Sequence, residues 1–148
     1  QWRNALSARY GFASSWSERH AAPVCALGCF GLSDGLITAV GKAVRVGSVV
    51  ARMSLPPAKR PYDRHDAWCL RAVGVDCRAC IARCPAGAIS EAGHDKAACR
   101  AYIEKVTAPF TAREQTGFAV SSCGLCQTGV PCEAKNPTAD LGGRRRRP

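Results

Sequence analysis

Residues 77–85 read CRACIARCP, and this short stretch decides the expected fold. Its pattern, Cys77-x2-Cys80-x3-Cys84-Pro85, matches the last three cysteines and the proline of the bacterial C-x2-C-x2-C-x3-C-P run. In that run the first three thiolates bind one 4Fe–4S cluster, and the cysteine before the proline binds a second. We expect Cys80 and Cys84 to face different clusters, because the proline fixes the direction in which the loop leaves.

The first cysteine of the bacterial run is missing here, since Gly74 stands in its place, and Cys69 lies eight residues before Cys77. Cys99 follows further along, and then the spaced set Cys123-x2-Cys126-x5-Cys132. Eight thiolates are the number that two 4Fe–4S clusters require. Crossed ligation assigns Cys69, Cys77, Cys80 and Cys132 to one cluster and Cys84, Cys99, Cys123 and Cys126 to the other.

Zinc is the main alternative, because Cys77-x2-Cys80 and Cys123-x2-Cys126 are paired knuckles that bind one structural ion through four thiolates. That assignment leaves four cysteines unused and does not explain the Cys-Pro pair. Disulfides are the third possibility. We expect the two remaining cysteines, Cys25 and Cys29, to be small buried residues that bind nothing.

The composition is that of a small globular protein: 148 residues, ten cysteines, 47% hydrophobic and 22% charged residues. No apolar run reaches the roughly 18 residues of a membrane span, and the N-terminus shows no secretory signal. We therefore expect a cytoplasmic protein, in which many cysteines indicate metal binding more than disulfides. The formal net charge of +10 falls to +6 without the terminal run Arg144–Arg147.

Composition divides the chain into residues 1–57, a proline-rich linker at 58–66, a cysteine-rich module at 67–137 and a basic tail at 138–148 that we expect to be disordered. In the first region we predict a helix over 17–27 begun by Ser17, and a two-stranded sheet from 35–40 and 42–55. In the module we predict a helix over 96–106 capped by Asp95, and a short strand at 118–120. The fold class is α+β.

Three segments of the module, WCLRAVGVDCRACIARCPAGAIS (68–90), GHDKAACRAYIEK (93–105) and SSCGLCQTGVPCEAKNP (121–137), carry a family resemblance. They resemble the C-terminal double-cluster module of the epoxyqueuosine reductase and reductive dehalogenase superfamily. The upstream stretch WSERHAAPVCALGCFGLSDGLITAVGKAVRVGSVV (16–50) resembles the part of the nitroreductase-like domain that borders the corrinoid in that superfamily. One departure is the final spacing, with five residues between Cys126 and Cys132 where the reductases usually have three.

The resemblance implies a two-cluster ferredoxin-like module preceded by a partial nitroreductase-like α/β piece. It also implies a corrinoid in the full-length protein, and makes Gly28, Gly31, Gly47 and Ser48 candidates for close approach to that cofactor. Because the substrate half of those enzymes lies upstream of the match, we expect this chain to be the electron-transfer part of an oxidoreductase, with no catalytic residue assigned.

The expected function is therefore delivery of single electrons from a redox partner protein to a reductase centre through two 4Fe–4S clusters. The alternative is a zinc-stabilised module that binds nucleic acid. We expect the protein to contact nucleic acid only through its arginine tail or because its substrate is a tRNA. We expect no contact with a membrane.

Overall fold

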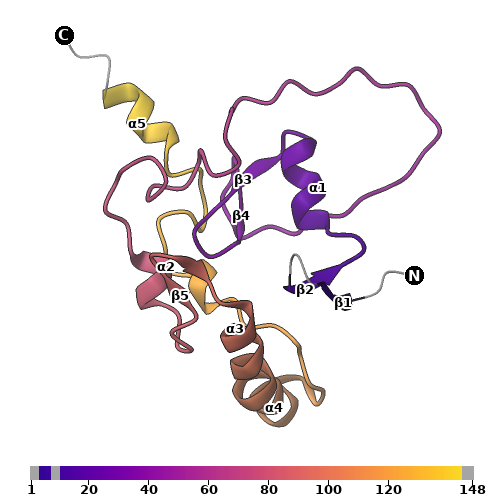
Figure 1. The fold of residues 1–148 in the computed structure, drawn as a ribbon, viewed down its shortest axis with the longest axis vertical. Coiled ribbons are helices and arrows are strands. Elements are labelled where there is room, and N and C mark those ends of the chain that lie inside the picture. Colours follow the sequence, from indigo (N-terminus) through magenta and orange to yellow (C-terminus); the bar gives the residue numbers. More distant parts are fainter. Residues whose placement is uncertain (1–3, 8–10, 145–148) are drawn as a thin grey trace.

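The computed structural model describes residues 4–7 and 11–144, which form a small α+β assembly of short elements (Figure 1). Its strands pair in three separate two-stranded antiparallel ladders, β1–β2, β3–β4 and β5–β6. The strands are β1 (Asn4–Ser7), β2 (Gly11–Ser14), β3 (Gly28–Phe30), β4 (Leu36–Thr38), β5 (Ile89–Ser90) and β6 (Gly93–His94). The helices are α1 (Glu18–Val24), α2 (Ala79–Ala82), α3 (Lys96–Tyr102), α4 (Ala108–Thr111) and α5 (Ala139–Arg144), together with η1 (Ile103–Thr107), η2 (Ala112–Thr116) and η3 (Leu125–Gln127).

The N-terminal half is built on the hairpin of β3 and β4, against which α1 packs. A tight loop closes this hairpin, where Gly31 N donates to Gly35 O at 2.9 Å. The side chains of Cys29 and Ile37 face each other across the ladder and are almost completely buried. The helix α1 begins after Ser17, as expected, and Pro23 lies in its last turn, where a missing N–H ends the helix early.

The hairpin packs on the cysteine-rich half through backbone hydrogen bonds, so the two halves form one folded unit. Phe30 N donates to His65 O, and Asn136 N donates to Ala39 O at 3.2 Å. His94 Nδ1 lies 3.2 Å from a carboxylate oxygen of Asp34. The proline-rich linker thus separates two regions that differ in composition, but these two regions pack on each other.

A helical arm runs from residue 96 to residue 116 and forms the far end of the molecule in Figure 1. The side chain of Asp95 accepts hydrogen bonds from Ala97 N and Ala98 N, which confirms the predicted cap. The arm is longer than predicted, because single π-type turns, η1 and η2, carry the backbone past Pro109. Proline has no N–H for the usual helical bond, and a wider turn accommodates that loss.

Two predicted strands are wrong. Residues 118–120 form no strand, and neither do residues 42–55, of which Lys42 is buried and residues 47–55 run on as an extended, exposed segment. Val49 and Val50 are 93% and 95% exposed. Alternating valines favour a strand, but a strand also needs a neighbour to receive its hydrogen bonds, and no other strand lies beside this segment within the described residues. β4 pairs with β3 instead.

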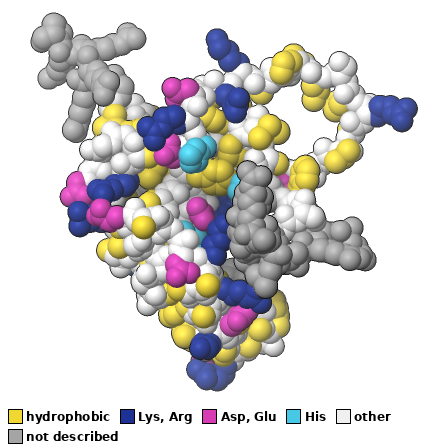
Figure 2. Space-filling view, viewed as in Figure 1, with side chains coloured by type: hydrophobic (Ala, Val, Ile, Leu, Met, Phe, Trp, Pro, Cys, Tyr) yellow, Lys and Arg dark blue, Asp and Glu magenta, His cyan; other side chains and the backbone are white. Residues whose placement is uncertain are grey.

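This extended segment makes the wide loop that stands away from the body in Figure 1, and Figure 2 shows apolar side chains along it. The tail differs from expectation as well, because α5 occupies part of the segment that was expected to be disordered. Residues 145–148 of that tail lie outside the described residues. Within residues 4–7 and 11–144, no helix combines the length and apolar character needed to cross a bilayer.

Buried apolar side chains are few and small. The buried hydrophobic residues of the described chain are Ala22, Cys29, Leu36, Ile37, Cys80, Ala88, Ile89 and Val130. Small domains with so little core commonly depend on a metal or another crosslink for stability. The position of the cysteines in this fold therefore bears on stability as well as chemistry.

Candidate metal centre

The motif of residues 77–85 forms a tight turn of helix with a cysteine at each end. Cys80 lies inside α2 and is buried, whereas Cys77 precedes the helix and Cys84 follows it. Cys84 N donates to Ile81 O at 3.1 Å, which closes the turn just before Pro85. Thiols placed before, within and after one short helix leave it in different directions.

A second cysteine loop, residues 123–132, is held against this helix by a single arginine. Arg83 Nε donates to Thr128 O at 2.9 Å, and its terminal nitrogen donates to Thr128 Oγ1 at 3.2 Å. Both cysteine loops therefore contribute side chains to the same region, although Arg83 and Thr128 are 45 residues apart in sequence.

Four thiols gather on one side of this region: Cys69, Cys77, Cys80 and Cys132. Burial raises the pKa of the Cys80 thiol, and the neighbouring thiols Cys69, Cys77 and Cys132 raise it further. Burial likewise raises the pKa of Cys132, and Cys69 adds to the effect. These four cysteines act on one another electrostatically and are called the first thiol group below.

The second thiol group consists of Cys84, Cys99, Cys123 and Cys126. Burial raises the pKa of Cys99, and the thiols of Cys126, Cys84 and Cys123 raise it further. The pKa of Cys126 is raised by burial and by Cys84 and Cys123. All four residues line one cavity of about 510 Å³, together with Ile89, Tyr102 and Ile103. The second group therefore opens onto a space shared by its four members.

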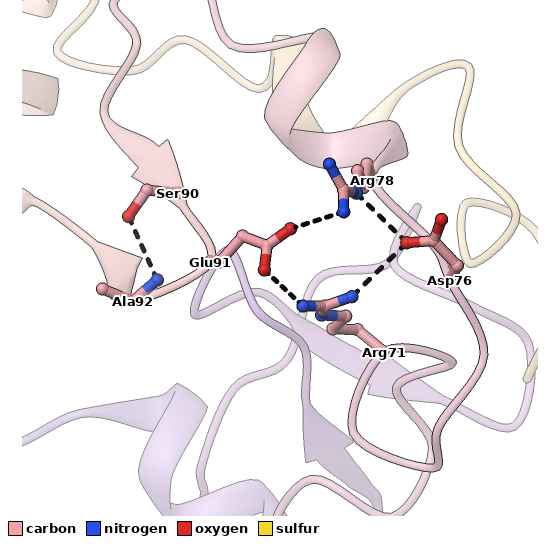
Figure 3. Close-up of polar contacts among 6 residues, drawn as sticks. All are labelled: Arg71, Asp76, Arg78, Ser90, Glu91 and Ala92. Atoms are coloured by element: carbon pink, nitrogen blue, oxygen red, sulfur yellow. Dashed lines mark hydrogen bonds and ion pairs between the residues drawn. The ribbon is translucent and has the colours of Figure 1, made fainter.

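An ion-pair ring braces the segment between Cys69 and Cys77 (Figure 3). Arg78 donates to Asp76 at 3.1 Å and to Glu91 at 3.0 Å, and Arg71 contacts the same two carboxylates. Glu91 lies in the turn between β5 and β6, so the ring ties this turn to the loop that carries Cys77. Exposed pairs contribute little stability individually, but a closed ring restrains the loop geometry.

Lys42 is a functional candidate that the sequence analysis did not identify. It is 4% exposed, and its charge lowers the pKa of Cys80, Cys132 and Cys126, so it acts on both thiol groups. A signal for it was present, because Lys42 is the one charged residue in GLITAVGKAV, residues 35–44. A lone lysine in an apolar stretch either points to solvent or has a partner inside the protein.

The glycines proposed to approach a cofactor contact other parts of the protein or face open space. A Cβ on Gly28 would lie 2.3 Å from Ile37 O across the hairpin, and one on Gly31 would lie 3.0 Å from Lys42 Nζ. Gly47 has nothing within 4 Å, and the exposed Ser48 donates its hydroxyl to a carboxylate oxygen of Glu18. None of these four residues lines the cavity of the second thiol group.

All ten cysteines lie within the described part of the chain, and all ten are free thiols, which excludes disulfides in this structure. Cys29 is completely buried, as predicted, and burial raises its pKa. Cys25 is exposed, so its expected burial is wrong. It follows Val24, the last residue of α1, at the surface of the molecule.

The comparisons with known proteins leave the family open. No protein-family model, curated protein or solved structure matches this chain. The ferredoxin-like and nitroreductase-like assignments therefore stay predictions, and the chemistry of the two thiol groups is the basis for assigning a function.

Within residues 4–7 and 11–144, no three histidine, cysteine or carboxylate side chains are grouped closely enough to hold a single metal ion. Four thiolates bound to one zinc ion at about 2.3 Å lie about 3.8 Å from one another. A 4Fe–4S cluster binds each thiolate through a different iron, so its four ligands lie farther apart than those of one ion. The two thiol groups are therefore spaced more widely than the ligands of a single zinc ion.

Proposed function

We propose that each thiol group binds one 4Fe–4S cluster and that the protein carries single electrons between a donor protein and a reductase centre. The observation that supports this proposal is the division of eight thiols into two separate groups of four, each containing cysteines from both loops. The two groups have the same members as the two ligand sets expected from crossed ligation. A bound 4Fe–4S cluster supplies one-electron storage without proton transfer.

The chain's own residues prepare the thiols for this role. Burial raises the pKa of Cys80, Cys99, Cys126 and Cys132 and outweighs the opposing charge of Lys42, so the empty protein favours the protonated thiols. Metal binding requires thiolates and releases those protons. A site of this kind favours a positively charged iron–sulfur core, which stabilises four thiolates that the empty protein disfavours.

The surroundings of the second group suit electron transfer through a protected centre. Ile89 is 3% exposed and lines the cavity beside Cys84 and Cys126. Burial and backbone N–H groups near the sulfurs are the means by which proteins set the potential of such centres. The proposal includes no corrinoid, because the four residues expected to approach one do not line this cavity.

The test is anaerobic purification of the 148-residue chain with analysis of iron, acid-labile sulfide and zinc. We expect about eight irons and eight sulfides per chain, with visible absorbance that dithionite bleaches as each centre gains an electron. Stoichiometric zinc in a colourless protein, with iron absent even after anaerobic reconstitution, would overturn the proposal.

Single-cysteine variants test the division into two groups. Cys99→Ala should lose about half of the iron and spare the first thiol group, and Cys80→Ala should do the reverse. Cys25→Ala is the matched control, because its thiol is exposed and belongs to neither group. Equal and complete loss of iron in both Cys99→Ala and Cys80→Ala, with Cys25→Ala fully loaded, would contradict two separate sites.

A further inference from the structure

Lys42 is a buried cation whose charge has no carboxylate partner in the described part of the chain. It is 4% exposed, and its Nζ donates to Ser33 Oγ at 2.8 Å. None of the ion pairs among the described residues includes it. Burying an ammonium group is costly unless opposite charge compensates it, and a neutral hydroxyl supplies only part of that compensation.

The protein holds this ammonium at a defined place. A Cβ on Gly31 would lie 3.0 Å from Lys42 Nζ, and one on Gly35 would lie 3.2 Å from it, so the two glycines leave just enough room for the lysine. At its other end, Lys42 N donates to Cys132 O at 2.9 Å and to Glu133 O at 2.8 Å. Backbone and side chain are thus both fixed.

The place where Lys42 is held is shared by the two thiol groups. The backbone N–H of Lys42 donates to Cys132 O in the first group, and the charge of Lys42 lowers the pKa of Cys132 and of Cys80. Its charge lowers the pKa of Cys126 in the second group, and Lys42 lines the cavity onto which that group opens. One cation therefore reaches both groups from its place just after the turn that follows β4.

We propose that Lys42 is the shared counter-cation of both clusters and raises the reduction potential of each, an inference that rests on the proposed function. A 4Fe–4S core held by four thiolates is anionic, and it supplies the opposite charge that the buried ammonium lacks. Reduction adds one electron and no proton, so the negative charge increases by one. A fixed positive charge nearby favours the reduced form.

The test is an anaerobic redox titration, followed by electron paramagnetic resonance, of the fully loaded chain and of Lys42→Met. Methionine is similar in length and uncharged. At a fixed potential near the midpoint, we expect the ratio of reduced to oxidised first cluster to fall about tenfold, which for one electron corresponds to about 59 mV. The second cluster should shift in the same direction. The Cys99→Ala background, which retains the first cluster, identifies which signal is which.

Lys59→Met is the matched control, because it removes the same charge from the exposed segment and should leave both potentials unchanged. Lys42→Arg keeps the charge, so the reduction potentials of its clusters should stay close to those of the parent chain, even where the larger head group reduces iron loading. A Lys42→Met protein that is fully loaded and has the potentials of the parent would overturn the inference while leaving the proposed function intact. Absence of iron from the parent chain itself would instead overturn the proposed function.

If Lys42→Met fails to load iron, Lys42→Arg decides the matter. Normal loading and potentials in Lys42→Arg support the role of the charge. A loaded Lys42→Arg protein whose ratio of reduced to oxidised cluster falls tenfold, as expected for Lys42→Met, would contradict that role, because the charge is still present.

Discussion

Replacing Gly41 by alanine should disrupt the contact between the turn after β4, residues 38–41, and the second cysteine loop. Gly41 has a φ of +91°, and a Cβ there would lie 2.3 Å from Glu133 O and 2.5 Å from Lys135 N. Both are backbone atoms, so neither moves aside as a flexible side chain does. The turn would have to move away from the loop that carries Cys132.

The expected cost has two parts. Placing alanine in the left-handed region costs about 1–2 kcal/mol at any position. Displacement of this turn also weakens the bonds from Lys42 N to Cys132 O and from Ala43 N to Glu133 O, each of which contributes about 1 kcal/mol. We therefore expect the free energy of unfolding to fall by about 3–4 kcal/mol.

Gly74→Ala is the matched control. Gly74 has a φ of +88°, and a Cβ there would meet nothing within 4 Å, so only the conformational part applies. Urea unfolding followed by tryptophan fluorescence, under anaerobic conditions, compares the two variants. With a slope of about 1–3 kcal/mol per molar urea, a difference of about 2 kcal/mol separates their midpoints by roughly 1 M. Equal midpoints would refute the reasoning, because they would show that the close approach at Gly41 contributes nothing.

Three further perturbations test other parts of the fold. Asp95→Ala should destabilise the protein by about 0.5–2 kcal/mol through loss of two cap hydrogen bonds, whereas Ser17→Ala, at a helix start without a side-chain cap bond, should have little effect in the same urea assay. Glu91→Gln should lower the urea midpoint at low salt and not at 1 M salt, because its two arginine partners are screened there; a loss that persists at 1 M would contradict an electrostatic origin. Anaerobic removal of iron by a chelator should unfold residues 67–137, measured as a loss of far-UV circular dichroism, and retained dichroism would show that packing alone holds the module.

Features set by neighbouring residues could be predicted from the sequence. Asp95 caps α3 as expected, since the cap depends on an acceptor placed two and three residues before free N–H groups. The expected division of the eight thiols rests on the crossed-ligation rule for two-cluster modules and not on local geometry, since it joins cysteines that are far apart in sequence. Binding of clusters to these groups stays a prediction.

Features set by distant partners could not be predicted in the same way. The valines of residues 42–55 have strand propensity, but the hairpin loop at 31–35 pairs β4 with β3 and leaves them without a neighbour. The role of Lys42 depends on cysteines that lie far along the chain. The sequence made Gly31 a candidate for contact with a cofactor, whereas in the structure the neighbour of Gly31 is Lys42. In each case the deciding contact joins segments that are far apart in sequence.

The exposed segment after the hairpin links the two halves of the chain. The contacts between the halves, and not this link, hold them together. Arg52 and Lys59 lie on this segment and are accessible to a protease with the specificity of trypsin, whereas Pro61 protects the bond after Arg60. A cut there severs the chain without touching the bonds from Lys42 to Cys132 and Glu133. The two fragments of such a cut share the same contacts that join the two halves of the intact chain. Each fragment supplies what the other lacks: one brings the thiols, and the other brings the buried positive charge.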